Sequence, residues 1–159
     1  TGSCAEYDWT LPPPYREVES PTGPTSAYGR AKDDLRRWTE SYAIARGVSV
    51  TWARLFFLYG PQEHPSRLIP SVASALLQGR PAEIATGNDV RDYLHVEDAS
   101  SALVALLDRD APGVVNVASG EGVTISSIAE RDWVASSLDG IAPVRAGRFV
   151  IHGAHDRAD

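Results

Sequence analysis

The sequence has 159 residues, 43% hydrophobic and 23% charged, a balance that is typical of a folded domain with a substantial core. Its formal net charge of -6 excludes a general nucleic-acid binder, because no run of Lys and Arg could neutralise a polyanion. No apolar run approaches the roughly 20 residues that cross a bilayer, and the first residues do not resemble a signal peptide, so we expect a cytoplasmic protein without a membrane partner.

Three features of the composition narrow this expectation. Cys4 is the single cysteine, so no internal disulfide can form, which fits a reducing compartment. The chain contains no Met, so we interpret it as part of a longer protein. It contains 14 Arg but one Lys, Lys32, and this retained lysine is a candidate for a role that arginine cannot fill.

The amino-terminal region predicts a strand end followed by a loop and a helix. Residues 8–24 contain five prolines, which forbid a long helix and favour an irregular surface loop. Thr25 or Ser26 is suited to cap a helix that runs to about residue 46 and ends at Gly47. Apolar residues recur there at three- and four-residue steps, the period of an amphipathic helix. They are Leu35, Trp38, Tyr42 and Ala45.

The rest of the chain predicts alternating strands and helices, and therefore an α/β fold built on a sheet. The β-branched and aromatic residues over 48–57 predict one buried strand. The elements expected after it are a helix over 68–79, a short strand over 82–87, a strand and helix over 91–108, a strand over 114–119, and a helix over 125–130 capped by Thr124.

Tyr28 and Lys32 lie four residues apart, so they occupy the same helix face one turn from each other. Free tyrosine titrates near ~10, and acting as a base near neutral pH requires about 4 kcal/mol from its surroundings. A cation ~4 Å away supplies about that much at an effective dielectric of ~20. The alternative is that Tyr28 packs on the first turn and Lys32 is a solvated surface cation.

Four segments decide between these alternatives: residues 1–7 (TGSCAEY), the Tyr-x-x-x-Lys helix, residues 53–61 (ARLFFLYGP) and residues 90–98 (VRDYLHVED). In this order, over about residues 1–130, they resemble the extended short-chain dehydrogenase/reductase family of NAD-dependent sugar-nucleotide epimerases and dehydratases. The resemblance implies a partial doubly wound, Rossmann-like parallel sheet with part of a small carboxyl-terminal substrate-binding region. It also implies that the amino-terminal half, with its glycine-rich phosphate turn, is missing.

The resemblance assigns a role to each matching residue. Ser3 would bind the reacting sugar oxygen, Tyr28 would act as general acid/base, and Lys32 would promote ionisation of the phenol and hold the nicotinamide ribose. Leu55 and Phe56 would lie beside the nicotinamide ring. The implied cofactor is NAD or NADP, and the implied parent enzyme is a homodimer acting on a nucleotide-linked sugar.

Two arginines would face the substrate. Arg91 matches the arginine that such enzymes place on the substrate diphosphate, a suitable role for a planar bidentate donor, and Arg67 would line the substrate cleft. The alternative for Arg91 is an ion pair with Asp92 or Asp98. We expect Asp98 to cap the helix that follows it.

Two departures from the family pattern bear on the reaction. Phe57 stands where many members have Asn to hold the sugar phosphate. Cys4 and Ala5 follow Ser3, where 4,6-dehydratases have Asp and Glu. Dehydration is therefore disfavoured, which leaves epimerisation or simple carbonyl and alcohol redox chemistry.

Residues 131–159 form a second region of different character. They resemble a segment of bacterial ribosomal-protein methyltransferases that contains no methyl-donor site. We interpret this region as a divergent or foreign tail joined to the epimerase/dehydratase part at about residue 130. Two alternatives stay open: a divergent end of the substrate region, and a catalytically dead remnant fused to a methyltransferase-like segment.

Overall fold

The computed structural model describes residues 1–82, 89–109 and 111–124, together with the backbone of 144–146 and 149–151. Its helices are α1 (Ala27–Arg46), α2 (Leu68–Leu77) and α3 (Val96–Leu107), and a 3-10 turn, η1, covers Cys4–Glu6. Its strands are β1 (Gly2–Ser3), β2 (Thr51–Leu55), β3 (Phe57–Tyr59), β4 (Val90–His95), β5 (Gly113–Val117), β6 (Gly122–Thr124), β7 (Val144–Ala146) and β8 (Phe149–Ile151).

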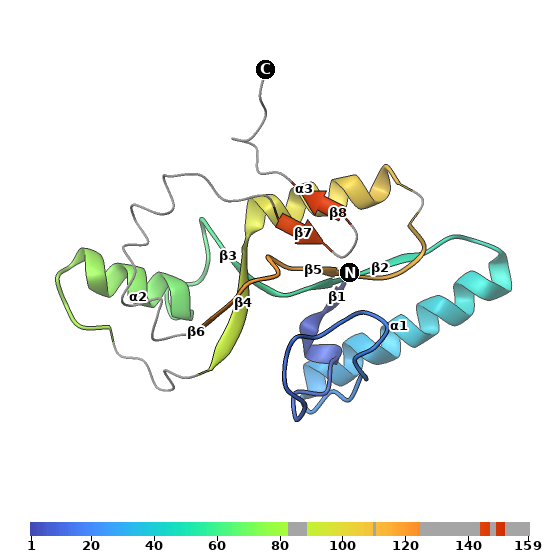
Figure 1. Cartoon of the computed structure of the whole chain (residues 1–159), viewed down its shortest axis with the longest axis horizontal. Helices are drawn as coiled ribbons and strands as arrows, with labels where there is room; N and C mark the ends of the chain where they lie inside the picture. Colours follow the sequence, from blue (N-terminus) through green and yellow to red (C-terminus); the bar gives the residue numbers. More distant parts are fainter. Residues whose placement is uncertain (83–88, 110, 125–143, 147–148, 152–159) are drawn as a thin grey trace, which may run out of the picture.

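A parallel sheet in the order β1-β2-β5 forms the centre of the fold. In its register Gly2 lies opposite Arg54, and Ala53 opposite Val115. Helices α1 and α3 lie on opposite sides of β2 and β5 (Figure 1). The predicted α/β architecture with a parallel sheet is therefore confirmed.

The prediction of one strand over 48–57 is wrong, because the chain changes partner strand at Phe56. Strand β2 ends at Leu55, and the backbone N–H of Phe56 donates a last hydrogen bond to the carbonyl of Val117. From Phe57 onward the chain pairs in parallel with β4, opposite Tyr93. β4 also pairs antiparallel with β6, so a second sheet in the order β3-β4-β6 diverges from the first.

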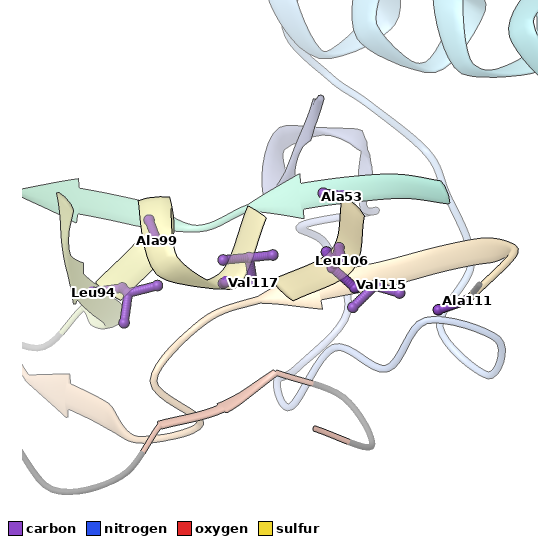
Figure 2. Packing of buried hydrophobic residues seen from close by; sticks show 8 residues of the cluster. Ala53, Leu94, Ala99, Leu106, Ala111, Val115 and Val117 are labelled. Atoms are coloured by element: carbon purple, nitrogen blue, oxygen red, sulfur yellow. The ribbon is translucent and has the colours of Figure 1, made fainter. Parts of the chain in front are cut away.

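The hydrophobic core lies between α3 and the central strands. Helix α3 contributes Ala99, Ala102 and Leu106, which recur at three- and four-residue spacing. They pack against Val115 and Val117 of β5, as the close view shows (Figure 2). Burying a side chain such as Leu106 stabilises the fold by about 1.5–3 kcal/mol, so this helix is firmly seated on the sheet.

Helix α1 confirms its predicted ends but not its predicted buried face. The Ser26 side chain accepts a hydrogen bond from the N–H of Gly29, and Gly47 closes the helix with a φ of 63°. Its buried residues are Gly29, Asp33 and Ala43. The four residues of the apolar stripe are all exposed in the described part of the chain. The buried face of α1 instead carries small and charged side chains. This stripe consists of Leu35, Trp38, Tyr42 and Ala45.

The later elements also follow the expected order. Helix α2, the β4 and α3 pair, and β5 are confirmed. Asp98 does not provide the cap of α3: His95 is the N-cap, and its ring nitrogen accepts from the N–H of Glu97, while Asp98 is buried in the first turn. The strand expected over 82–87 and the helix expected over 125–130 lie, apart from residue 82, outside the described residues.

Candidate active site

Ser3 stands where β1 ends and η1 begins. Its backbone is extended, with φ of -148° and ψ of 150°, and its Oγ accepts a hydrogen bond from the N–H of Ala5 at 3.2 Å. The N–H of Ser3 donates to a carboxylate oxygen of Glu6 at 2.8 Å. These two bonds form a reciprocal capping box, which fixes the backbone of Ser3 from both sides.

Tyr28 and Lys32 lie on one face of the first turns of α1, as their spacing predicts. The Lys32 Nζ is 5.8 Å from the centroid of the Tyr28 ring and donates to the carbonyl of Thr1 at 3.1 Å. Tyr28 is 58% exposed, so more than half of the residue is open to solvent. Lys32 therefore ties the helix to Thr1, the residue that directly precedes β1.

Gly29 explains why α1 can approach the Ser3 turn so closely. A Cβ at Gly29 would collide with the backbone carbonyl oxygen of Ala5 and would lie 2.9 Å from the Cβ of Pro24. Neither a backbone oxygen nor a proline ring can easily move aside. The Tyr-Gly-Arg-Ala-Lys sequence therefore needs its glycine to bring Tyr28 beside the segment that contains Ser3.

A cleft of about 470 Å³ opens between the proline-rich loop and the ends of the two sheets. Of the predicted site residues, Phe56 and Arg91 line it. Arg67 lies elsewhere, at the start of α2, where its Nε is 3.4 Å from Glu63. The other four predicted residues are not among the lining of this cleft. They are Ser3, Tyr28, Lys32 and Leu55.

Arg91 enters this cleft between aromatic rings. Its guanidinium carbon lies 5.2 Å from the Trp9 ring centroid and 5.4 Å from that of Phe57, and these two rings meet edge to face at 5.8 Å. Its ion-pair partner is Asp89, at 2.9 Å, and not Asp92 or Asp98, the partners that the alternative interpretation named. The Phe57 ring thus contributes directly to the surroundings of the Arg91 guanidinium.

Asp92 also lines the cleft, and its carboxylate binds the turn between β5 and β6. Its two carboxylate oxygens accept hydrogen bonds from the N–H and hydroxyl of Ser119 and from the N–H of Gly120, at 2.7 to 2.8 Å. Burial raises the pKa of Asp92, even though these bonds act in the opposite direction. The carboxylate therefore holds the turn between β5 and β6.

Sequence reasoning missed the residues that anchor the proline-rich loop. The side-chain Nδ2 of Asn116 donates to the carbonyl of Tyr15, and its side-chain Oδ1 accepts from the hydroxyl of Tyr7 at 2.8 Å. The backbone N–H of Asn116 donates to Glu17. The rings of Tyr7 and Tyr15 stack at 5.2 Å. Asn116 is a polar residue inside an apolar strand, and that signal could have identified it.

Cys4 directly follows Ser3 but is poorly suited to chemistry. It is 5% exposed, and burial raises the pKa of its thiol to about 11. The thiolate is the reactive form, and a thiol with this raised pKa stays protonated at neutral pH. Cys4 therefore serves only as a small buried side chain. Over the described part of the chain, no group of three or more His, Cys, Asp or Glu could hold a metal ion. In that same part, none of the helices could span a membrane.

Comparison with known proteins identifies the family to which this chain belongs. Residues 1–118 match the model of the NAD dependent epimerase/dehydratase family. The chain is similar to a UDP-glucose 4-epimerase of Corynebacterium glutamicum, with 31% identity over 150 residues that cover 81% of this chain and 46% of the relative. The chain belongs to the NAD dependent epimerase/dehydratase family.

The structural comparison agrees. A UDP-N-acetylglucosamine 4-epimerase from Methanobrevibacter ruminantium, solved in complex with UDP-N-acetylmuramic acid, superposes with a TM-score of 0.72 and 25% identity. The match covers 87% of this chain and 46% of that structure. The chain thus spans less than half the length of these relatives.

A second, shorter similarity is to a different class of protein. A ribosomal protein L11 methyltransferase of Rhodopseudomonas palustris is 51% identical over 61 residues, which cover 38% of this chain and 18% of the relative. The expected resemblance to ribosomal-protein methyltransferases is therefore confirmed over a short stretch. A domain boundary at about residue 130 stays a prediction, and residue 130 lies outside the described residues.

Proposed function

We propose that the protein is an NAD(P)-dependent epimerase or reductase of a nucleotide-linked sugar, cytoplasmic and homodimeric in its full-length form. One observation carries the proposal: the exposed Tyr28 and the charged Lys32 share a helix face that Gly29 seats against the turn of Ser3. The family membership and the sugar nucleotides named for two relatives support this assignment.

The residues present fit the nicotinamide end of the cofactor. Lys32 is an ammonium donor held at the edge of β1, and Leu55 and Phe56 follow at the end of the neighbouring strand. We assign these residues, together with Tyr28, to binding the nicotinamide and its ribose. When bound, NAD(P) supplies acceptance and return of a hydride.

Proton transfer then belongs to the side chains of this chain. The Tyr28 phenolate oxygen takes the proton of the sugar hydroxyl during oxidation and returns it during reduction. Lys32 stabilises the negative charge on that oxygen, and the Ser3 hydroxyl donates a hydrogen bond to the reacting oxygen. Arg91 binds the substrate diphosphate from the cleft, and Arg67 contacts the substrate from the start of α2.

Epimerisation or redox chemistry is favoured over dehydration by the residues after Ser3. Dehydratases of the family use an acid and a base at the positions of Cys4 and Ala5. A thiol with a pKa of about 11 and a methyl group cannot supply them. The proposed reaction therefore moves a hydride between the sugar and the nicotinamide without loss of water.

The test uses the full-length gene product with NAD and NADP in turn, and with UDP-glucose and UDP-N-acetylglucosamine as probes. We expect a stereoisomer or an oxidised sugar in the proton NMR spectrum of the products. Unchanged sugars together with no calorimetric binding of cofactor or sugar nucleotide would contradict the proposal. Binding without conversion would favour the alternative of a catalytically dead remnant joined to a methyltransferase-like segment, for which the short methyltransferase similarity speaks.

A further inference from the structure

Glu6 is a fully buried acid in the turn that follows Ser3. Its exposed fraction is 0%, and it lies among the largest completely buried side chains of the described residues. A buried carboxylate is costly unless charges and hydrogen bonds surround it. The partners that this protein supplies therefore indicate what the carboxylate is there to hold.

Glu6 has side-chain partners on β2 and α1. The Nε of Arg54 donates to it at 2.7 Å, and the indole N–H of Trp52 donates to its two oxygens at 3.1 and 3.2 Å. Arg36 of α1 adds a charge 3.9 Å away. The carboxylate is thus fixed from β2 and from α1, so it can act as a rigid acceptor.

The remaining partner of this rigid acceptor is the backbone N–H of Ser3, at 2.8 Å. Ser3 also pairs with Leu55 in the register of β1 and β2. Its Oγ accepts a hydrogen bond from the N–H of Ala5 and also interacts with the Cys4 thiol, so a ligand oxygen would compete only with sulfur, a weak acceptor, for the hydroxyl hydrogen. The contacts of Ser3 with Glu6, Leu55 and Ala5 therefore fix the backbone from which its hydroxyl extends.

We propose that Glu6 is a positioning residue that acts through Ser3. Its carboxylate holds the Ser3 backbone in the extended conformation from which the hydroxyl meets the reacting oxygen. The inference rests on the proposed function, because it assumes that Ser3 contacts the substrate. The competing explanation is that Glu6 only neutralises the buried Arg54, whose exposed fraction is 2%.

Two paired variants separate these explanations. Glu6→Gln/Arg54→Leu removes both buried charges but keeps an amide oxygen as the acceptor for Ser3. Glu6→Leu/Arg54→Leu removes the charges and that acceptor as well. Both variants remove the two members of a buried ion pair together, which leaves no unpaired charge in the interior, so both proteins are expected to fold. Glu6→Gln alone is the second variant if Arg54→Leu prevents folding, since it also keeps the acceptor.

The measurements are made on the full-length gene product with its cofactor and a converted sugar nucleotide. We expect kcat within about threefold of wild type for the Gln pair and a loss of roughly 10–100-fold for the Leu pair, with KM little changed. Leu106→Ala, which weakens the distant core at α3, controls for a general loss of stability. In a Ser3→Ala background the two pairs should become equal in kcat, because the residue through which Glu6 acts is gone.

Hydrogen exchange of the Ser3 amide gives a readout that does not depend on activity. The amide should exchange faster in the Leu pair than in the Gln pair or in Glu6→Gln. Equal kcat and equal exchange in all of these variants would overturn the positioning role. If Ser3→Ala alone leaves kcat unchanged, the proposed function of Ser3 fails instead, and the exchange data still decide whether Glu6 holds this backbone.

Discussion

Behind Ser3 the protein buries charged groups that are joined by hydrogen bonds, whereas around Arg91 it surrounds a cation with aromatic rings. The first region, the Glu6 network, contains Glu6, Arg54 and Trp52, with contacts of 2.7 to 3.2 Å. In the second region, Trp9 and Phe57 lie 5.2 and 5.4 Å from the guanidinium.

This difference has a physical meaning. Hydrogen bonds to charged groups have narrow distance and angle preferences, so the Glu6 network fixes one backbone geometry. Arg91 is held by cation–ring contacts of more than 5 Å and by an ion pair with the exposed Asp89, so its guanidinium can adjust to a bound group more easily. The side of the site assigned to proton transfer is therefore rigid, and the side assigned to the substrate is adaptable.

The largest expected effect on stability comes from separating α1 from the Ser3 turn. Gly29→Ala places a Cβ against the carbonyl of Ala5, and such overpacking costs about 3 kcal/mol. Alanine regains about 1 kcal/mol of helix propensity, so the net loss is about 2 kcal/mol. Chemical denaturation measures it. Ser41→Ala, at an exposed position of the same helix, should stay within about 0.5 kcal/mol, and an equal result for both would refute the close approach.

A smaller effect is expected at Asp33, the buried acid of α1. Burial would raise the pKa of Asp33, but hydrogen bonds and charges from Arg36 and Arg37 together hold it below its ordinary value of 3.8. Its stabilisation is therefore present above pH 3.8 and is lost as the pH falls through the lower folded-state value. Asp33→Asn should cost about 1.5 kcal/mol at pH 7.

Denaturation curves at several pH values check the sign of this effect. The gap between wild type and Asp33→Asn should narrow as the pH falls below about 4, since the wild-type carboxylate becomes protonated there. A gap that does not change between pH 7 and pH 3 would show that the charge of Asp33 contributes nothing.

The smallest effect on stability is expected in the aromatic region. Arg91→Lys should change the free energy of unfolding by less than about 0.5 kcal/mol, because ring contacts accommodate a second cation. A compact ammonium cannot bind a diphosphate in bidentate fashion, so KM for the sugar nucleotide should rise about tenfold, or 1.4 kcal/mol. Steady-state kinetics separate KM from kcat, and an unchanged KM would remove Arg91 from the substrate side.

The sequence predicted much of the fold because the relevant signals are local. Ser26 and Gly47 set the ends of α1, and the strand and helix expected over 91–108 correspond to β4 and α3. The partner change at Phe56 could not be predicted, because it depends on where Val117 and Tyr93 come to lie.

The site could be predicted only in part, because some of its contacts are local in sequence and others are not. The four-residue spacing of Tyr28 and Lys32 is local, so the shared face could be derived. The Glu6 and Arg54 pair spans the whole of α1 and its flanking segments, and one sequence gives no sign of it. Arg91 was selected by its motif, but its position beside the rings of Trp9 and Phe57 depends on tertiary packing.

The central claim is that Tyr28 transfers the proton while the rigid side of the site holds the reacting oxygen. Rapid mixing of the NAD-loaded full-length protein with its sugar nucleotide follows the absorbance of reduced nicotinamide in a single turnover. Tyr28→Phe should lower this rate by roughly 10²–10⁴-fold, with a melting temperature close to that of wild type. A Tyr28→Phe protein whose rate stays within threefold of wild type would contradict the account.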